Sequence, residues 1–144
     1  MNTKIQIVKP LLVELPLQVS TYDIDIAGHV NNIVYVRWLE DLRNLFFSKF
    51  ISFENLLEEN LYPVIASTNI RYYKQIKLFD ELKGFLWLEK ISRVILNFSA
   101  EFIVDNLVAA SAEQRCVIYN FKESKMEKIP IEIADKYALV KNHC

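Results

Sequence analysis

The sequence has 144 residues, of which 52% are hydrophobic, and its formal net charge is −1 at pH 7. A chain of this length predicts one domain, 1–144, with enough apolar side chains for a full core. The balanced charge and the lack of a long basic run argue against a nucleic-acid partner and against binding to an anionic membrane surface. No apolar run comes near the roughly 20 residues that a membrane-spanning helix needs.

The cysteines and histidines are few, and their spacing argues against two further kinds of site. Cys116 and Cys144 do not make a disulfide framework, so we expect the reducing cytoplasm as the compartment. Cys116 lies within a predicted strand and is expected to be a small core residue. The two histidines, His29 and His143, lack the spacing of metal ligands, and we expect no metal site.

A strand and a polar loop are the first predicted elements. Residues 11–20, LLVELPLQVS, combine apolar and β-forming residues, and Pro16 limits this strand to a sheet edge or a bulge. Residues 22–32, YDIDIAGHVNN, then place two acids, a histidine, two asparagines and Gly28 directly ahead of the longest helical pattern. Gly28 and Gly84 are the only glycines, which argues against a glycine-rich loop for phosphate or dinucleotide binding.

The main helix is predicted over residues 32–50. Asn31 precedes it and suits the N-cap position, because its side-chain oxygen can accept from a free backbone amide. Glu40 and Arg43 are three residues apart and are expected to form a surface or interface ion pair. The apolar residues recur at the spacing of an amphipathic helix and form the stripe Tyr35, Trp38, Leu39, Leu42, Leu45 and Phe46.

After a partly helical connector at 51–62, the pattern changes to β-strands. A turn is expected at 122–125 and a short strand at 126–130, and the pattern allows a final helix over 131–139. Long segments rich in β-branched and aromatic residues, joined by tight connections, predict an antiparallel meander; they are 63–75, 80–91, 94–106 and 107–121. One helix cannot cover both faces of such a sheet, so the sheet curves around the helix, a second copy covers the rest, or both.

The segment DIDIAGHVNNIVYVRWLEDLR, residues 23–43, resembles the hotdog-fold thioesterases, specifically the 4-hydroxybenzoyl-CoA thioesterase-like group of acyl-CoA and acyl-carrier-protein thioesterases. The shared pattern is D-x-D-x-x-G-x-V, followed by a helix bearing Y-x-x-W/F and an acid near an arginine. FDEL at 79–82 stands where that family commonly has G-D-E-L, and the resemblance extends over 17–121. It implies an α+β hotdog fold, in which a curved antiparallel sheet wraps around a long central helix, and a homodimer or homotetramer.

The resemblance also implies roles for residues of the loop and the helix start. Asp25, the second acid of the motif, would be the catalytic carboxylate, acting as nucleophile or as general base toward water. The backbone amide near Asn32 would hold the oxyanion, since unpaired amides at a helix start favour negative charge. Gly28 would let the chain turn between them. Many relatives carry an aromatic residue or a histidine in place of Asn32, so any side-chain role there is changed in this chain.

Further candidate residues surround these two. Asp23 is expected to hold loop amides. His29 and Asn31 are assigned to substrate binding, with His29 orienting Asp25 or a water molecule and Asn31 mainly capping the helix. Arg93 stands at a strand start where relatives place basic residues near the phosphates of coenzyme A, and the guanidinium fork suits phosphate.

The predicted function is therefore cleavage of acyl-CoA or acyl carrier protein thioesters to the free acid and thiol. No separate cofactor is expected, because coenzyme A or phosphopantetheine is part of the substrate. One alternative is a hotdog protein that binds acyl thioesters without cleaving them. A dehydratase or hydratase is disfavoured, because residues 32–50 contain no histidine. The sequence leaves open the acyl group, the carrier, the mode of attack, and dimer versus tetramer.

Overall fold

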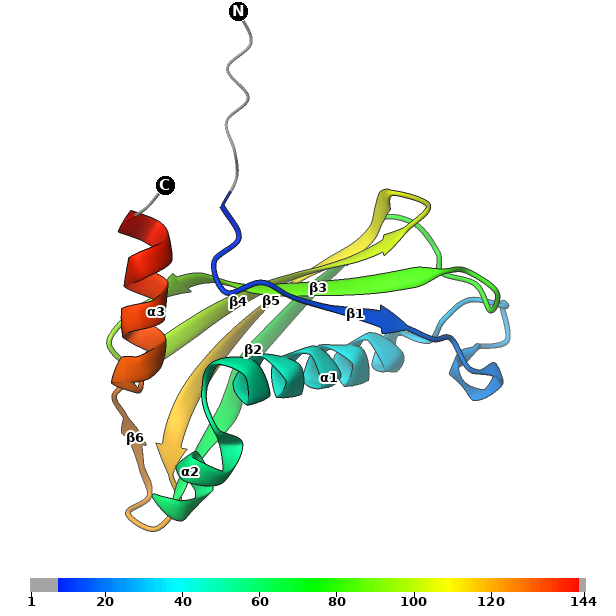
Figure 1. Ribbon diagram of the computed structural model, residues 1–144. Coiled ribbons are helices and arrows are strands. Elements are labelled where there is room, and N and C mark those ends of the chain that lie inside the picture. Colours follow the sequence, from blue (N-terminus) through cyan, green and yellow to red (C-terminus); the bar gives the residue numbers. More distant parts are fainter. Residues whose placement is uncertain (1–7, 143–144) are drawn as a thin grey trace, which may run out of the picture.

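The computed structural model describes residues 8–142, so His143 and Cys144 lie outside the described residues. Figure 1 shows a curved antiparallel sheet with one long helix along its concave side, which confirms the α+β class and the expected wrapping. In chain order the elements are β1 (Val13–Leu17), the 3-10 turn η1 (Thr21–Asp23), α1 (Asn32–Phe50), α2 (Phe53–Glu58), β2 (Leu61–Tyr72), β3 (Leu82–Ile91), β4 (Ile95–Val104), β5 (Leu107–Asn120), β6 (Lys125–Glu127) and α3 (Ile131–Asn142).

The strand order is β1-β3-β4-β5-β2, with β6 added beside β5. β3, β4 and β5 form the predicted meander, but β2 pairs with β5 at the far edge and does not neighbour β3. The prediction of one continuous meander of the long strands is therefore wrong for β2. The reason is that residues 73–81 do not form a hairpin. They pass the start of α1 and carry the chain from one side of the sheet to the other (Figure 1).

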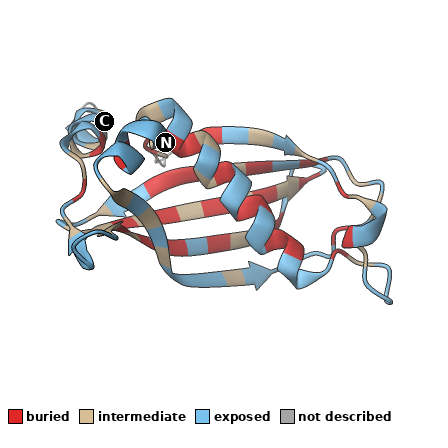
Figure 2. Ribbon diagram, turned by 90° about the horizontal axis from the view of Figure 1, so that it is seen from below, coloured by how far each residue is buried: buried red, intermediate tan, exposed pale blue. Residues whose placement is uncertain are grey.

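The central helix has the predicted bounds and the predicted cap. Asn31 is extended, and its side-chain oxygen accepts a hydrogen bond from the amide of Ile33. Leu45 of the predicted stripe is only half-buried, whereas Val34 and Phe47 join the buried face. Figure 2 shows this buried face of α1 against the buried residues of the strands, so most of the core lies between the helix and the sheet.

The second glycine, Gly84 of β3, lies against side chains of β1 and α1. A Cβ atom at Gly84 would lie 2.8 Å from Leu17 Cδ1 and 3.1 Å from Leu42 Cδ1. A side chain at this position would require the ends of the Leu17 and Leu42 side chains to move. Pro16 lies beside this contact in β1, which is an edge strand as the proline predicted.

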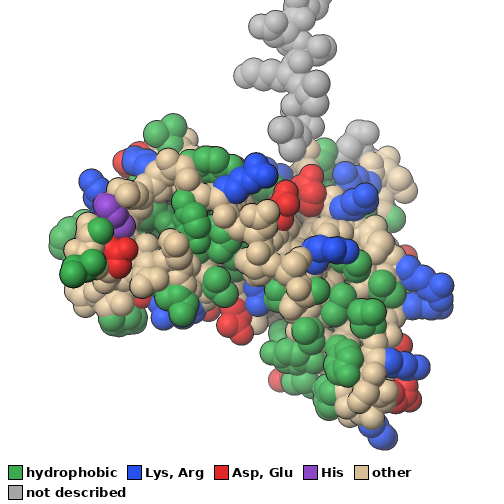
Figure 3. Space-filling model, turned by 180° about the vertical axis from the view of Figure 1, so that it is seen from behind, with side chains coloured by type: hydrophobic (Ala, Val, Ile, Leu, Met, Phe, Trp, Pro, Cys, Tyr) green, Lys and Arg blue, Asp and Glu red, His purple; other side chains and the backbone are tan. Residues whose placement is uncertain are grey.

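The burial of Cys116 and the mixed character of the surface agree with the expectations from the sequence. Cys116 is fully buried in β5, as expected, and burial raises the pKa of its thiol to about 12. On the face seen from behind, acidic, basic and hydrophobic side chains are interspersed (Figure 3). Within residues 8–142, no helix is long and apolar enough to cross a membrane.

Candidate functional site

The loop that carries Asp25 is closed on itself by hydrogen bonds. Asp25 N–H donates to the His29 carbonyl over 2.8 Å, and Gly28 N–H donates to the Asp25 carbonyl over 3.0 Å. Oδ1 of Asp25 accepts from the amides of Ala27, at 2.9 Å, and His29, at 3.1 Å. Gly28 has φ = +81°, a conformation that glycine adopts without strain. The loop thus fixes the carboxylate through one oxygen, while Oδ2 has no partner among residues 8–142.

Asn31 provides the acceptors for two of the amides at the start of α1. The Asn31 side chain accepts from Ile33 N–H at 3.2 Å, and the Asn31 carbonyl accepts from Val34 N–H at 2.9 Å. The amide of Asn32 has no acceptor in the described part of the chain. Asn32 therefore presents an unpaired N–H at the end of a long helix, where the dipole favours negative charge.

Asp23 holds the base of this loop, as the sequence suggested. Its side chain is only 3% exposed, and it accepts from Arg37 Nη2 at 2.5 Å and from the Ser20 amide at 2.8 Å. Its carbonyl accepts from the amide of Asn31 at 2.8 Å. The two acids of the motif therefore differ: Asp23 is buried and fully engaged, and Asp25 is exposed with one oxygen free.

The segment after β2 forms the opposite wall of the site. The amides of Tyr73 and Lys74 both donate to the Ala109 carbonyl, and Val30 N–H donates to the Ile76 carbonyl at 2.9 Å. These bonds anchor the crossing segment to β5 on one side and to the motif loop on the other. Together they enclose a cavity of about 580 Å³, lined by Asp25, His29, Val30, Asn32, Tyr35, Tyr72, Tyr73, Lys74, Gln75 and Ile76.

The inner wall of this cavity is aromatic. The rings of Tyr35 and Tyr72 meet edge to face, with centroids 5.0 Å apart. Trp38 and Phe102 contact Tyr35 from within the core, at 5.4 Å each. Burial raises the pKa of the Tyr35 phenol to about 12, so this hydroxyl stays protonated at neutral pH. Residues 72–76 carried no sequence signal for the site, because their position depends on where β2 pairs.

The structure brings three of the five predicted site residues together. Asp25, His29 and Asn32 line one cavity. The backbone amide of His29 orients the carboxylate of Asp25, and its imidazole makes no hydrogen bond to residues 8–142. Asn31 does not line the cavity, and its side-chain oxygen is committed to the helix cap.

Arg93 lies at the opposite end of the sheet. It stands in the turn between β3 and β4, where its carbonyl accepts from the amide of Ile129, just ahead of α3. The strand register places this turn near the start of β2, whereas the cavity lies at the end of β2. Within one chain, Arg93 is therefore not brought to Asp25.

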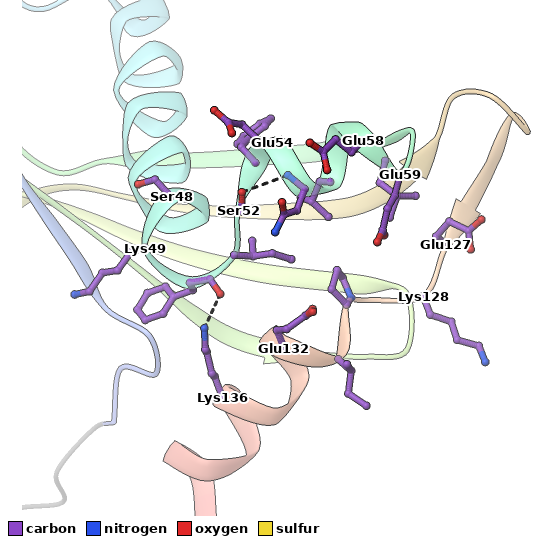
Figure 4. A pocket seen from close by; sticks show the side chains of 18 of the residues that line it. Ser48, Lys49, Ser52, Glu54, Glu58, Glu59, Glu127, Lys128, Glu132 and Lys136 are labelled. Carbon is purple, nitrogen blue, oxygen red and sulfur yellow. Dashed lines mark hydrogen bonds between the residues drawn. The ribbon is translucent and has the colours of Figure 1, made fainter.

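A larger cleft of about 1300 Å³ lies at the other end of α1, among the ends of α1, α2 and α3. The cleft is lined by acidic and basic side chains, namely Glu54, Glu58, Glu59, Glu127, Glu132, Lys49, Lys128 and Lys136 (Figure 4). The helix end here presents carbonyls, and Lys136 Nζ donates to the Phe50 carbonyl at 2.7 Å. Negative charge on a substrate would be disfavoured at such an end, so the smaller cavity is the better candidate for acyl chemistry.

The chain is similar to a known family over most of its length. The model of the thioesterase-like superfamily matches residues 19–137. None of the curated proteins matches the sequence.

Solved structures give the same result at the level of the fold. A predicted thioesterase from Bacillus stearothermophilus has a TM-score of 0.78 at 23% identity, covering 89% of this chain and 95% of that one. A Thermus thermophilus thioesterase complexed with coenzyme A and Zn has 0.78 at 19%, covering 94% and 98%. A hypothetical Staphylococcus aureus protein in complex with CoA has 0.83 at 16%, covering 96% and 89%. The hotdog fold expected from the sequence is confirmed.

Proposed function

Because this chain belongs to the thioesterase-like superfamily, we propose that it hydrolyses acyl-CoA or acyl carrier protein thioesters to the free acid and thiol. One observation carries the proposal. Asp25, whose carboxylate has one free oxygen, and Asn32, whose amide is unpaired, line the same cavity. An attacking group and an oxyanion donor are the two parts that acyl transfer to water needs.

In the proposed reaction, the thioester carbonyl oxygen accepts a hydrogen bond from Asn32 N–H. Asp25 either takes a proton from water as the water attacks the carbonyl carbon, or attacks it directly to form an anhydride that water then cleaves. The tetrahedral intermediate collapses with loss of the thiolate, which takes up the proton that water gave. The helix start lowers the energy of the oxyanion at each tetrahedral stage.

The carrier is proposed to be coenzyme A or phosphopantetheine. Two of the similar structures, from Thermus thermophilus and Staphylococcus aureus, were crystallised with CoA, which supports CoA. Lys74 lines the cavity and would place positive charge beside a carrier phosphate. Arg93, at the far end of its own chain, would need a second subunit to reach that phosphate.

We propose that the enzyme is a homodimer joined along β2, two such dimers forming a tetramer if their outer faces also pair. β2 is an edge strand of 12 residues, none of which is buried. Tyr62 and Val64 are exposed hydrophobic residues on it. A long open edge with apolar side chains is a surface that soluble proteins cover. The compartment is proposed to be the cytoplasm, on the cysteine content alone.

The proposal predicts that Asp25→Asn abolishes most of the turnover. Asparagine keeps the size of the side chain and one acceptor oxygen but loses the charge and the basicity. We expect kcat/KM on a panel of acyl-CoAs to fall by at least about 100-fold with little change in KM. The measurement is steady-state thiol release, with folding checked by circular dichroism.

Asp41→Asn is the matched control, because Asp41 is an exposed acid on α1 outside the cavity. Undiminished turnover in folded Asp25→Asn would exclude Asp25 as nucleophile or base. Tight binding of acyl-CoA by the wild type without any thiol release would favour the non-catalytic alternative.

A further inference from the structure

The hydroxyl of Tyr35 is a buried donor without a protein partner. Tyr35 is 2% exposed, yet its hydroxyl makes no hydrogen bond to any residue from 8 to 142. Over the same residues, no sealed side-chain nitrogen or oxygen lacks a partner, so this hydroxyl is not enclosed in the core. It therefore opens onto the cavity that Tyr35 lines.

The position of Tyr35 places this hydroxyl at the acyl end of the proposed site. Tyr35 lies one turn beyond Asn32 on α1, and helical side chains lean toward the helix N-terminus. Its ring packs against Trp38 and Phe102 on the core side and against Tyr72 on the cavity side. The carrier arm must leave toward solvent, so the acyl group takes the inner, aromatic end.

A hydroxyl at this point does not serve the fold. Phenylalanine would make the same ring contacts without a polar atom that must be satisfied at the edge of the core. Tyr73, which also lines the cavity, has its hydroxyl 3.1 Å from Ser111 Oγ, so it is engaged within the protein. Tyr35 is thus an almost fully buried residue of the cavity whose hydroxyl is left open to a ligand.

Building on the proposed hydrolase, we propose that the Tyr35 hydroxyl is a specificity determinant that donates a hydrogen bond to an oxygen carried by the acyl group. The enzyme then prefers acyl groups with a hydroxyl or oxo substituent over unsubstituted hydrocarbon groups of the same length. The substituent satisfies the Tyr35 hydroxyl, which a plain alkyl chain leaves unpaired and shielded from water.

The test compares butyryl-CoA with 2-hydroxybutyryl-, 3-hydroxybutyryl- and 3-oxobutyryl-CoA. For the wild type, kcat/KM for at least one substituted substrate should exceed that for butyryl-CoA by about tenfold, the worth of one net hydrogen bond. In Tyr35→Phe this ratio should fall to about one, because the hydrogen bond to the substituent is lost. Tyr137→Phe is the control, because Tyr137 lies on α3, away from the cavity, and its hydroxyl donates to the Glu89 carbonyl of β3. It should retain the wild-type ratio.

The inference is overturned if the wild type does not prefer a substituted substrate over butyryl-CoA, or if Tyr35→Phe retains that preference. In either case, hydrolysis of butyryl-CoA would still support the proposed function. If no thioester is cleaved, the proposed function fails and binding decides the inference. Calorimetry would then compare two thioether ketones that cannot be hydrolysed, S-(2-oxopentyl)-CoA and S-(4-hydroxy-2-oxopentyl)-CoA. The wild type should bind the hydroxylated ketone about tenfold more tightly than the plain one, and Tyr35→Phe should bind the two equally. An unfolding free energy unchanged in Tyr35→Phe supports a ligand role, and a clear loss would mean that the hydroxyl serves the fold.

Discussion

Two aspartates two residues apart differ in role because their surroundings differ. Asp23 is buried, and its carboxylate and carbonyl together hold Ser20, Arg37 and Asn31. Asp25 keeps a free oxygen on an exposed loop. We therefore expect the first acid to contribute mainly to stability, and the second is the proposed reactive group.

Asp23→Ala should lower the free energy of unfolding by about 2 kcal/mol. The loss arises because the Ser20 amide and the Arg37 guanidinium lose their acceptor. Arg37 is 54% exposed and can be hydrated, which keeps the cost below that of breaking a fully buried pair. Urea denaturation measures the change, with the exposed Asp41→Ala as the control. A loss no larger than that of the control would contradict the structural role.

At the scale of the elements, α1 is attached to the sheet by a polar link within an apolar interface. Arg43 Nη1 donates to Gln114 Oε1 at 2.6 Å, and Gln114 Nε2 donates to Thr68 Oγ1 at 2.9 Å. The sequence predicts an ion pair between Arg43 and Glu40. This prediction is wrong, because the guanidinium of Arg43 hydrogen-bonds to Gln114 instead. Arg43 reaches inward to β5, and burial lowers the pKa of its guanidinium.

Gln114→Ala should cost about 2 kcal/mol of unfolding free energy, because it leaves Arg43 partly buried without an acceptor. Gln114→Glu should cost less, since it keeps an acceptor and adds a compensating charge. Glu113→Ala, on the exposed face of the same strand, should change stability by less than about 0.5 kcal/mol. Equal losses in the alanine and glutamate variants at 114 would argue against the arginine contact as the cause.

At the scale of the whole molecule, two buried acidic groups make the free energy of unfolding depend on pH in the alkaline range. Folding raises the pKa of Cys116 from 9.0 to about 12 and that of Tyr35 from 10.0 to about 12. Above pH 9 the unfolded chain loses protons that the folded chain keeps. The contribution of these two groups to the free energy of unfolding should therefore be constant below pH 9 and fall as the pH rises toward 12.

The decline should approach about 1.4 kcal/mol per pH unit for each group that is ionised only in the unfolded chain. Guanidinium denaturation at pH 8, 9.5 and 11 measures it. Cys116→Ala removes one of the two groups and should flatten the curve. A decline as steep in this variant as in the wild type would exclude the thiol as a contributor.

The proposed dimer is tested at the edge of the sheet. Val64→Lys adds a charge to the exposed face of β2, which disfavours pairing of two edges, and should shift the protein toward monomers by sedimentation equilibrium. Leu107→Lys is the control, because Leu107 is also exposed but lies on β5, inside the sheet. A wild type that sediments as a monomer at micromolar concentration would contradict the dimer.

The sequence by itself determined the features that depend on residues close together in the chain, namely the central helix, its cap and the motif loop. The spacing of Tyr35, Trp38 and Leu42 predicted the helix and its buried face, and Asn31 predicted its start. The loop of Asp25 and Gly28 closes through bonds within a few residues, so its shape also follows from local chemistry. For this reason the sequence sufficed to name the carboxylate and the helix-start amide of Asn32 as candidates.

Only the tertiary structure decided where β2 pairs, and with it the rest of the site. Strand pairing is non-local, and no spacing within β2 distinguishes β3 from β5 as its partner. That choice sends residues 73–81 past the start of α1, closes the cavity with Tyr72 and Lys74, and leaves the Tyr35 hydroxyl open to it. The pairing of the strands also separates Arg93 from Asp25. The two residues lie at opposite ends of the sheet, and the register that places them there depends on segments distant in the chain.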